Sequence, residues 1–409
     1  MTKKLRILSV YEGFFSGGAR ILHTDVILGL QQLGHQNTVL SINSHVFREN
    51  TEQPMYGDKC YKKLVENGIP VKTIGRRGNA EIDTSAFLDH ELQILKDEVA
   101  KADVILTLKE QPLRLLKQID VRKPVIACLH RSDPENQGVA LSDLIEGVNK
   151  QIVNASILCA RTARDAYAEA GVTRDAMKVV INGVDLSAFK HLEKDRKSIR
   201  GEYDITRGAP VIVFAARFDH MKNVKLFVKA ARMFLYENPK AHIFMCGTGM
   251  DTQNAELNKI LKYNFLGVES MLKRVHLLGV RLDMPKIYSA ADIVSSTSSF
   301  GEAYPLCLLE GMACRTIPVT TNVGDTKYML QAEKLGILTK EDPRSVADAW
   351  HLAHAKRNLY RSNIIKVRAS FDRKYMVERY ERVIKKTHSR YVKLTSQKPT
   401  EPSILEGVL

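Results

Sequence analysis

Two glutamates, Glu302 and Glu310, stand with seven residues between them in the segment FGEAYPLCLLEGMAC. Apolar residues at helical spacing begin after Glu302 and continue past Glu310, which predicts a helix that starts between the two carboxylates. A carboxylate before a helix and another about two turns along it can hold two ends of one ligand. The start of a helix also offers free N–H groups and the positive end of its dipole to an anion. The segment therefore indicates a ligand site, although two glutamates on a solvated helix would show the same spacing.

Two cations flank a junction between an expected strand and an expected helix in the segment AARFDHMKN. Arg217 comes at the end of the strand, and Lys222 stands where the amphipathic pattern of Val224–Tyr236 begins. Two cations beside the positive end of a helix suit a diphosphate. Solvated basic side chains are the alternative, because the chain has many of them. We favour the diphosphate site because both cations fall at one junction.

Other segments place histidine or glycine at the carboxyl end of an expected strand, where open parallel sheets bind ligands. His130 follows Val125–Leu129, and a neutral imidazole there could hold hydroxyl groups. It could equally be an ordinary buried or surface histidine. Gly17 and Gly18 follow the first strand and Gly247 follows another, so the backbone can approach a ligand at both places. The spacing is not G-x-G-x-x-G, so no dinucleotide fingerprint is present.

Short apolar runs alternate with amphipathic stretches along the chain, and these elements must position the residues above. The runs expected as strands form two series: Leu5–Tyr11, Thr38–Ile42, Val71–Ile74, Val104–Leu108, Val125–Leu129 and Ser156–Cys159, then Val211–Ala216, His242–Cys246, Val275–Leu278, Ile293–Ser296 and Thr316–Thr320. The stretches expected as helices include Arg20–Leu33, Leu88–Val99, Val224–Tyr236 and Val346–His354. Apolar strands between helices are typical of parallel sheets covered on both faces. The predicted fold class is therefore α/β, with two doubly wound, Rossmann-like domains.

The boundary between the two series is expected near Asn182–Lys190, where VVINGVDLSAF ends an apolar run with an Asn-Gly turn and a charged stretch follows. We assign 1–185 to an N-terminal domain and 186–370 to a C-terminal domain. An amphipathic pattern from residue 371 predicts a further helix over 371–390. Residues 391–409, rich in Ser, Pro, Thr and Lys, are expected to form a loose tail.

The composition limits the class of protein. A chain of 409 residues suits two domains, and no run of about 18 uncharged apolar residues predicts a membrane span. The first apolar run is short and broken by Glu12, so it indicates a strand and not a signal peptide. The six cysteines show neither C-x-x-C nor zinc spacing, which favours buried, reduced thiols of a cytoplasmic protein.

The formal net charge is +15. A basic surface without a role, a phosphate-rich ligand, a polyanionic acceptor and an anionic membrane face would each explain it. Nucleic acid is disfavoured because no basic helix, aromatic RNA motif or zinc-finger spacing accompanies the charge. Basic residues of the first half favour peripheral contact with the inner face of a membrane: Arg76, Arg77, Lys117, Arg122 and Lys123. The lack of an amphipathic helix rich in Trp or Phe disfavours it, so both readings stay open.

These segments, in this order, resemble the retaining GT-B glycosyltransferases of the family 4 or group 1 type, whose E-x7-E element FGEAYPLCLLE matches. ARFDHMKN resembles their GRL-x-x-x-KG element, and VVINGVD (179–185) resembles VIPNGVD. Two departures stand out: Arg20 replaces the acidic residue of the family's GGxE loop, and Asn223 replaces a glycine. The resemblance implies two Rossmann-like domains facing a cleft, with an acceptor-binding N-terminal domain, a donor-binding C-terminal domain and a C-terminal helix that crosses back to the first domain.

The resemblance also implies roles for the residues at the matching positions. Glu302 would contact hydroxyls of the donor sugar, and Glu310 would contact the nucleotide ribose. Arg217 and Lys222 would hold the diphosphate, and His130 would face the sugar near its reacting carbon. The implied catalytic set is thus His130, Arg217, Lys222 and Glu302. Further donor contacts, mostly through backbone, are implied at Gly17, Gly18, Gly247, Val280, Ala303, Tyr304 and Leu306.

The expected reaction is transfer of a hexosyl-type sugar from a nucleotide diphosphate sugar to an acceptor hydroxyl, with retention of configuration. The acceptor would be a saccharide, a lipid-linked sugar or a small molecule, in polysaccharide, glycolipid or natural-product biosynthesis. No D-x-D-like motif occurs at a matching place, so we expect no tightly bound metal and no cofactor. Two alternatives keep the fold: a nucleotide-sugar 2-epimerase, and a nucleotide-sugar-binding protein without catalytic activity.

Overall fold

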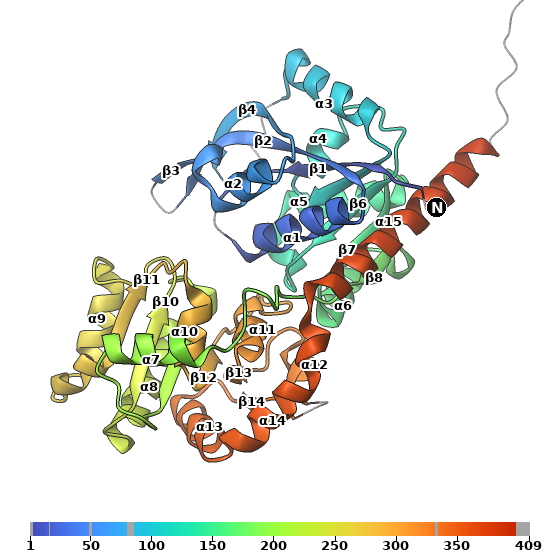
Figure 1. The fold of residues 1–409 in the computed structure, drawn as a ribbon. Helices are drawn as coiled ribbons and strands as arrows, with labels where there is room; N and C mark the ends of the chain where they lie inside the picture. The colour runs from blue at the N-terminus through green and yellow to red at the C-terminus, as the bar shows by residue number, and fades with distance from the viewer. Residues whose placement is uncertain (1–2, 16, 49–50, 80–85, 332–333, 398–409) are drawn as a thin grey trace, which may run out of the picture.

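The computed structural model describes residues 3–15, 17–48, 51–79, 86–331 and 334–397, which form two α/β domains (Figure 1). Each domain has a largely parallel sheet with helices against it. This confirms the expected fold class, two doubly wound Rossmann-like domains. The central strands of both sheets are almost fully buried, because helices cover both faces.

The sheet of the first domain has the strand order β3-β2-β1-β5-β6-β7-β8, with β4 also paired to β2. All pairs are parallel except β2 with β3. The strands are β1 (Arg6–Tyr11), β2 (Gln36–Arg48), β3 (Thr51–Pro54), β4 (Val71–Asn79), β5 (Val104–Leu108), β6 (Val125–Leu129), β7 (Val153–Leu158) and β8 (Met177–Val179). The helices are α1 (Gly18–Gln32), α2 (Lys59–Glu66), α3 (Asp89–Lys101), α4 (Leu113–Leu116), α5 (Val139–Asn149) and α6 (Arg161–Glu169).

The sheet of the second domain is wholly parallel, with the order β11-β10-β9-β12-β13-β14. Its strands are β9 (Val211–Ala215), β10 (His242–Cys246), β11 (Val275–Gly279), β12 (Ile293–Ser296), β13 (Ile317–Thr321) and β14 (Ile337–Thr339). Its helices are α7 (Glu193–Glu202), α8 (Val224–Glu237), α9 (Ala255–Asn264), α10 (Met284–Ala290), α11 (Leu306–Ala313), α12 (Thr326–Gln331), α13 (Pro343–Ala355) and α14 (Arg357–Val367). The fully buried Trp350 packs against Phe227 and Phe234 and joins α13 to α8.

Two connections join the domains, and they pair with each other. The N–H of Val184 donates to the carbonyl of Phe371 (2.8 Å), and the N–H of Arg373 donates to the carbonyl of Val184 (2.9 Å). Gly183 is required beside this pair, because a Cβ there would lie 2.5 Å from the Cα of Arg373. The hinge is therefore a short two-stranded bridge rather than two loose loops.

The last helix, α15 (Arg373–Ser396), leaves this hinge and packs on the first domain, against α1 (Figure 1). Its apolar face enters a core cluster of that domain through Met376, Val377, Tyr380 and Ile384. The helix continues beyond residue 390, where its end was expected, because no Pro or Gly interrupts the sequence before Pro399. The rest of the expected tail, 398–409, lies outside the described residues.

Several expected elements differ in length or were missed. Strands β2 and β4 run well past the expected Ile42 and Ile74, because they pair with each other through two register shifts. Strands β3, β8 and β14 have only three or four residues each, too few to show a pattern. All six cysteines are free, and five of them are buried. Within the described residues, no helix combines the length and apolar character needed to cross a bilayer.

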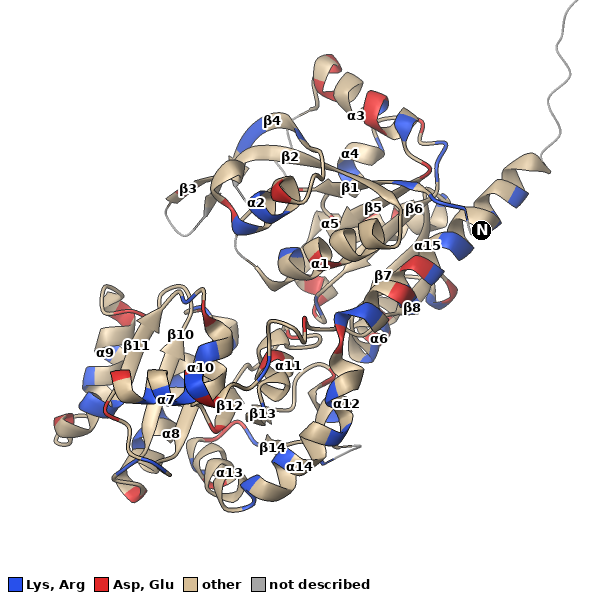
Figure 2. Cartoon of the chain, viewed as in Figure 1, with Lys and Arg blue, Asp and Glu red and all other residues tan. Residues whose placement is uncertain are grey.

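The basic residues that favoured a membrane contact have acidic partners in most cases. Arg76 binds Glu91 with two nitrogens (2.7 and 2.6 Å), and Lys117 contacts Asp143 (2.9 Å). Arg122 contacts Asp120 at 2.7 Å. Figure 2 shows Lys and Arg spread over helices of both domains and not gathered on one element. This arrangement weakens the charge argument for a membrane-binding first domain.

Candidate functional site

Lys222 and Glu302 form an ion pair at the carboxyl ends of β9 and β12. The hydroxyl of Ser298 also donates to the same oxygen of Glu302, at 3.1 Å. Burial opposes the charge on Lys222, but the carboxylate of Glu302 outweighs it, so the pKa of Lys222 is raised; the nearby Arg217 acts in the opposite direction. The site therefore holds a partly buried ammonium group, 17% exposed, whose charge is stabilised by one carboxylate.

The turn that carries Lys222 depends on Asn223. This residue, which stands where the resembled motif has glycine, has φ 48° and ψ 54°, in the left-handed region that glycine adopts readily. Asn tolerates that region, and its side-chain oxygen accepts from the N–H of Leu226 (3.2 Å), which caps α8. Its amide nitrogen also donates to Ser299 at 2.9 Å. The substitution of glycine by asparagine thus keeps the turn and adds a tie to the loop before Glu302.

Arg217 lies on the same turn, with its guanidinium 3.1 Å from Asp219 and its side chain 29% exposed. The loop after β10 packs directly on this segment. Gly247 (φ 131°) is needed there, since a Cβ would lie 2.1 Å from the carbonyl oxygen of Ala216. The N–H of Gly247 donates to the carbonyl of Gly279 (2.7 Å), which brings the exposed Val280 to the same sheet edge.

Glu310 lies on α11 and accepts a hydrogen bond from the hydroxyl of Tyr288 at 3.1 Å. Burial raises the pKa of this carboxyl to about 7, although the Tyr288 bond acts in the opposite direction. Among the described residues, Glu310 has no hydrogen bond or ion pair with Arg217, Lys222 or Glu302. It is therefore a separate group, half-protonated near neutral pH, on the helix that follows the Glu302 loop.

The loop that carries Glu302 is held by close backbone contacts. Gly301 (φ 74°) lies against Met221, and Gly324 (φ 61°) lies so close that its Cβ would be 2.4 Å from the carbonyl oxygen of Glu302. The N–H of Asp325 donates to the carbonyl of Ala303 at 2.8 Å. These contacts fix the position of the carboxylate through the backbone, as a ligand site requires.

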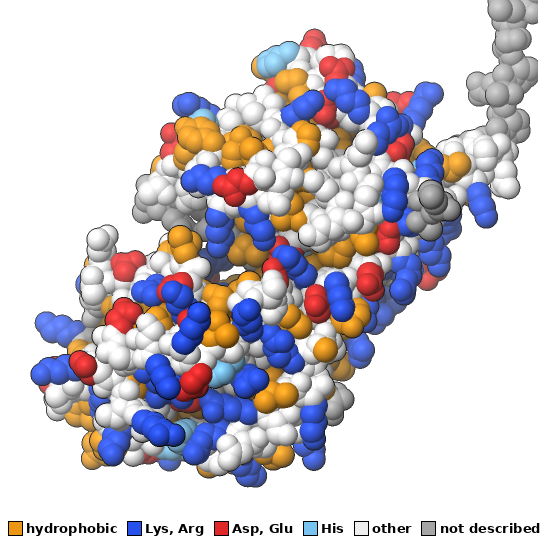
Figure 3. Space-filling model, in the orientation of Figure 1, with side chains coloured by type: hydrophobic (Ala, Val, Ile, Leu, Met, Phe, Trp, Pro, Cys, Tyr) orange, Lys and Arg blue, Asp and Glu red, His pale blue; other side chains and the backbone are white. Residues whose placement is uncertain are grey.

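The first domain meets this loop with the end of β6. The hydroxyl of Ser132 donates to the carbonyl of Glu302, and Arg131 lies near Gly301 while it binds Asp133 at 2.7 Å. A Cβ on Gly18, at the start of α1, would lie 3.5 Å from the side chain of Leu306. The structure thus brings both of these first-domain segments to the Glu302 loop. In Figure 3, the face in view has a hollow between the domains, with Lys and Arg at its rim.

His130 directly precedes Arg131 and Ser132 in the chain. Both of its ring nitrogens are buried without a hydrogen-bond partner in the described part of the chain. Burial, helped by the charge of Lys109, lowers the pKa of His130 to about 4. The imidazole is therefore neutral at physiological pH, and in this form it offers one hydrogen-bond donor and one acceptor.

Arg20 stands where the resembled family has an acidic residue, but its side chain turns inward and contacts the glycine loop itself. It is 2% exposed, stacks on Phe15 at 3.1 Å, and donates to the carbonyl of Gly13 (2.8 Å) and to Glu12 (3.1 Å). Gly17 lies beside its guanidinium. Arg20 therefore acts inside the glycine loop, where it holds Glu12 in place.

Sequence reasoning missed three polar residues near the junction of the domains. Glu12 and Lys109 follow β1 and β5, lie 3.7 Å apart, and could have been found by the rule that identified His130. Asp325 of the second domain accepts from the N–H groups of Arg161 (2.8 Å) and Thr162 (2.9 Å), and so caps α6 of the first domain. No local sequence signal marks such a cap. Among the described residues, no group of three or more His, Cys, Asp or Glu could hold a metal ion.

The second domain is similar to a known protein family. Residues 195–367 match the family model of glycosyl transferases group 1. This range contains Arg217, Lys222, Glu302 and Glu310, so the four charged residues of the site fall within the matched family domain.

Curated relatives are identical to the chain at about a quarter of the aligned positions. It is 26% identical over 224 residues to the D-inositol 3-phosphate glycosyltransferase of Corynebacterium jeikeium, an alignment of 53% of this chain and 52% of that protein. It is 29% identical over 168 residues to an Escherichia coli UDP-Gal:alpha-D-GlcNAc-diphosphoundecaprenol alpha-1,3-galactosyltransferase, an alignment of 40% of this chain and 42% of that protein. The chain spans about half the length of the curated relatives that it matches.

Solved structures match nearly the whole chain. HepE of Anabaena, in complex with UDP and glucose, aligns with a TM-score of 0.73 and 18% identity, over 96% of this chain and 100% of that one. Sucrose-phosphate synthase of Thermosynechococcus elongatus aligns with a TM-score of 0.69 and 16% identity, over 96% and 100%. The fold is that of the GT-B glycosyltransferases.

Proposed function

We propose that this protein is a retaining glycosyltransferase, which moves a hexosyl group from a nucleotide diphosphate sugar to an acceptor hydroxyl. The observation that carries the proposal is the partly buried pair of Lys222 and Glu302, with Arg217 on the same turn. Two cations that oppose each other's charge favour a bound anion between them. The match of 195–367 to glycosyl transferases group 1 supports the same reading.

Arg217 and Lys222 would bind the diphosphate and stabilise the charge that develops when it leaves. The bond between the anomeric carbon and the phosphate oxygen breaks, and its electron pair goes to that oxygen. The acceptor oxygen attacks the same face of the carbon and gives its proton to the departing phosphate oxygen. Cations held in a water-poor site stabilise such a leaving group without first having to reorganise. We propose that they do so without a tightly bound metal, which unchanged turnover in EDTA would support and a loss restored by Mg²⁺ would contradict.

Glu302 and His130 would position the sugar. The carboxylate of Glu302, fixed by its loop and paired with Lys222, would accept hydrogen bonds from sugar hydroxyls. The two unpaired ring nitrogens of the neutral His130 offer one donor and one acceptor for the same purpose. Glu310 would bind the ribose. Backbone groups of Gly17, Gly18, Gly247, Val280, Ala303, Tyr304 and Leu306 would complete the donor site.

UDP-sugars are the donors to test first, because the structure of HepE holds UDP and glucose, and the named E. coli relative uses UDP-Gal. The acceptors in the relatives' names are an inositol phosphate and a lipid-linked saccharide. We propose that the acceptor here is a saccharide, a lipid-linked sugar or a small polyhydroxylated molecule, in the synthesis of a polysaccharide, glycolipid or natural product.

A donor screen tests the proposal. The protein is incubated with UDP-, GDP-, ADP- and dTDP-sugars. The melting temperature of each mixture is measured, and the slow release of nucleotide is followed separately. We expect stabilisation by one nucleotide family, and its loss in Lys222→Ala but not in Lys225→Ala, a change at an exposed position of α8. A folded sample that responds to no nucleotide would contradict the proposal. Tight binding of a nucleotide sugar without turnover on any acceptor would favour the alternative, a nucleotide-sugar-binding protein without catalytic activity.

A further inference from the structure

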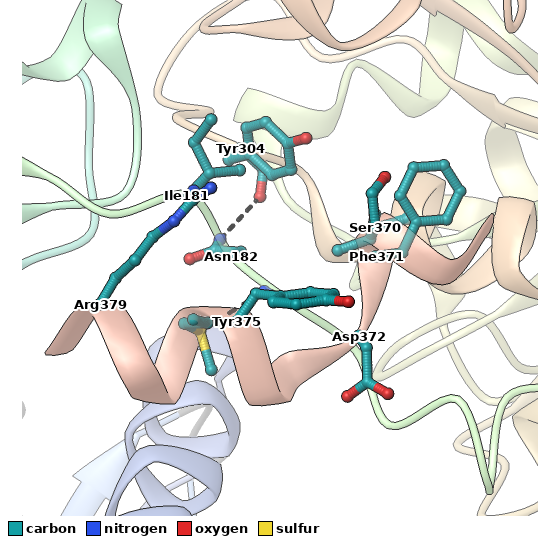
Figure 4. A pocket seen from close by; sticks show the side chains of 11 residues that line it. Ile181, Asn182, Tyr304, Ser370, Phe371, Asp372, Tyr375 and Arg379 are labelled. Atoms are coloured by element: carbon teal, nitrogen blue, oxygen red, sulfur yellow. Dashed lines mark hydrogen bonds between the residues drawn. The ribbon is translucent and has the colours of Figure 1, made fainter. Parts of the chain in front are cut away.

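A cavity of about 390 Å³ lies at the hinge. It is partly open and is bordered by the first connection, the start of α15 and the segment that leads into α11 (Figure 4). Its walls include Asn182, Tyr304, Leu309, Phe371, Tyr375 and Arg379. This volume is in the range of small-molecule sites, roughly 300–1,000 Å³, which often occur between domains. Of its lining residues only Tyr304 belongs to the proposed donor site, and there through its backbone.

A second cavity of about 280 Å³ shares Ile181 and Tyr304 with the first. It is lined by Arg161 and Lys327, among others. Tyr304 therefore lies at the wall between the two cavities. The two cavities are thus neighbours along the hinge; Arg379 lines the first, and Arg161 and Lys327 line the second.

Three cations and two carboxylates line the two cavities, so cations are in excess. Arg379 and Lys327 have no ion-pair partner in the part of the chain that the structure describes. The acidic residues of the walls are already engaged by backbone N–H groups: Asp372 accepts from Lys374 (2.9 Å), and Asp325 caps α6. A ligand here would meet aromatic surfaces and an unpaired guanidinium, which suits an anion attached to a flat, apolar body.

We propose that the hinge cavity binds a small aromatic anion, and that its binding strengthens binding of the nucleotide sugar in the cleft. The body of the ligand would lie among Tyr304, Phe371 and Tyr375, and its anionic group would meet Arg379, whose side chain extends beside Ile181 toward Tyr304 in Figure 4. The second half of this inference rests on the proposed function.

Coupling to the cleft follows from where the walls come from. Asn182, on one connection, donates to the carbonyl of Tyr304 at 3.1 Å, and Tyr304 lies two residues after Glu302. Phe371 and Tyr375 belong to the other connection and to α15. The shape of the cavity thus depends on the angle between the domains. A ligand that fits the cavity in the present arrangement of the domains stabilises that arrangement. By thermodynamic linkage, this ligand and the nucleotide sugar must change each other's affinity by the same factor.

The probe for this site is anilinonaphthalene sulfonate, an aromatic anion whose fluorescence rises in apolar surroundings. It is titrated into the full chain, and the binding constant and stoichiometry are measured. Arg379→Glu reverses the charge at the cavity, and Ser370→Trp fills the cavity from an exposed position. Arg382→Glu is the matched control, since it makes the same change at an exposed position of α15 that does not line the cavity.

We expect one saturable site, weakened at least about tenfold by Arg379→Glu and by Ser370→Trp but not by Arg382→Glu. Equal binding to all four proteins would overturn the site. Titration of UDP-glucose with and without the probe should show affinity raised roughly fivefold or more. Unchanged affinity would overturn the coupling. Absence of any nucleotide binding would count against the proposed function, while the fluorescence titration would still decide whether the cavity binds the anion.

Discussion

Lys222 and Glu302 are 80 residues apart in the chain, and yet the ammonium group of one is bound to the carboxylate of the other. The pair joins the turn after β9 to the loop after β12, so it exists only when both loops are in place. In the free protein each charge has a partner, which makes the partial burial of both tolerable. In the complex that we propose, the ammonium group of Lys222 would contact both the diphosphate and the carboxylate of Glu302. The carboxylate would then lie beside the sugar that is attached to the diphosphate.

The first prediction concerns this pair. Lys222→Ala and Arg217→Ala should each lower turnover by about 10²–10³-fold, because each removes a charged donor from the leaving group. Glu302→Ala should reduce kcat strongly while the protein stays folded. Steady-state kinetics with circular dichroism as a folding check would measure this, with Lys225→Ala as the control. Folded variants with near-normal rates would show that these residues are not the site.

The second prediction uses the raised pKa of Glu310. In the unfolded chain this carboxyl titrates near its ordinary value of 4.5, whereas in the folded protein it titrates near 7. Both states bind the proton below pH 4.5, so no penalty exists there. As the pH rises to 7, the unfolded state loses the proton first, and the free energy of unfolding falls by an amount on the order of 2–3 kcal/mol. Glu310→Gln should remove this fall, as urea denaturation at pH 4.5 and pH 8 would show.

The same carboxyl should link donor binding to proton release. If ribose hydroxyls bind the ionised form, the affinity for UDP-glucose should rise with pH until about pH 7 and then level off. Calorimetry at pH 6 in two buffers of different ionisation enthalpy would detect the released proton. Glu310→Gln should show no release, and release that persists in this variant would assign the proton to another group.

The third prediction concerns Asp325, which caps α6 across the domain boundary. Asp325→Ala should lower the free energy of unfolding by about 1–2 kcal/mol, the usual effect of losing a cap. It should also lower turnover, because it loosens the contact between the domains. Asp342→Ala is the matched control, since Asp342 caps α13 within one domain through the N–H of Ser345 at 2.9 Å. Equal turnover in both variants would argue against a role for this contact in catalysis.

The fourth prediction concerns Arg20 and Glu12. Arg20→Met should lower the free energy of unfolding by about 3–5 kcal/mol, because the buried carboxylate of Glu12 would lose its closest partner. The change Arg6→Met removes an exposed ion pair with Asp103, which solvent screens, and should have a much smaller effect on stability. Guanidinium denaturation would compare the two. A small effect at Arg20 would mean that Lys109, at 3.7 Å, can replace it.

The sequence predicted the regular parts of this structure because they depend on local patterns. The central strands of both sheets, such as β5 and β6, are apolar along their whole length and stand between helical patterns. Strands β3, β8 and β14 could not be predicted, since three or four residues show no period and are stabilised by their neighbours. The long ends of β2 and β4 depend on each other across the sheet, which a single segment cannot reveal.

The candidate site was predictable only as a set of chain segments. The position of a residue at the end of a strand pointed to His130, Arg217 and Lys222. The pairing of Lys222 with Glu302, however, depends on how the loops pack. The role of Arg20 was also hidden, because an arginine in a glycine loop gives no sign that it will turn inward onto Glu12. The cap that Asp325 gives to α6 spans more than 160 residues, and such distances carry no sequence signal.

The packing of α15 on the first domain has a consequence for synthesis on the ribosome. The first domain buries Met376, Tyr380 and Ile384, which are translated after every strand of the second domain. Its groove beside α1, where Val377 touches Gly29, must stay open to water until then. The usual order, in which the N-terminal domain folds first, is thereby reversed for the final step. The second domain can complete its folding while the first domain still exposes apolar surface. A chaperone could bind this surface during that interval.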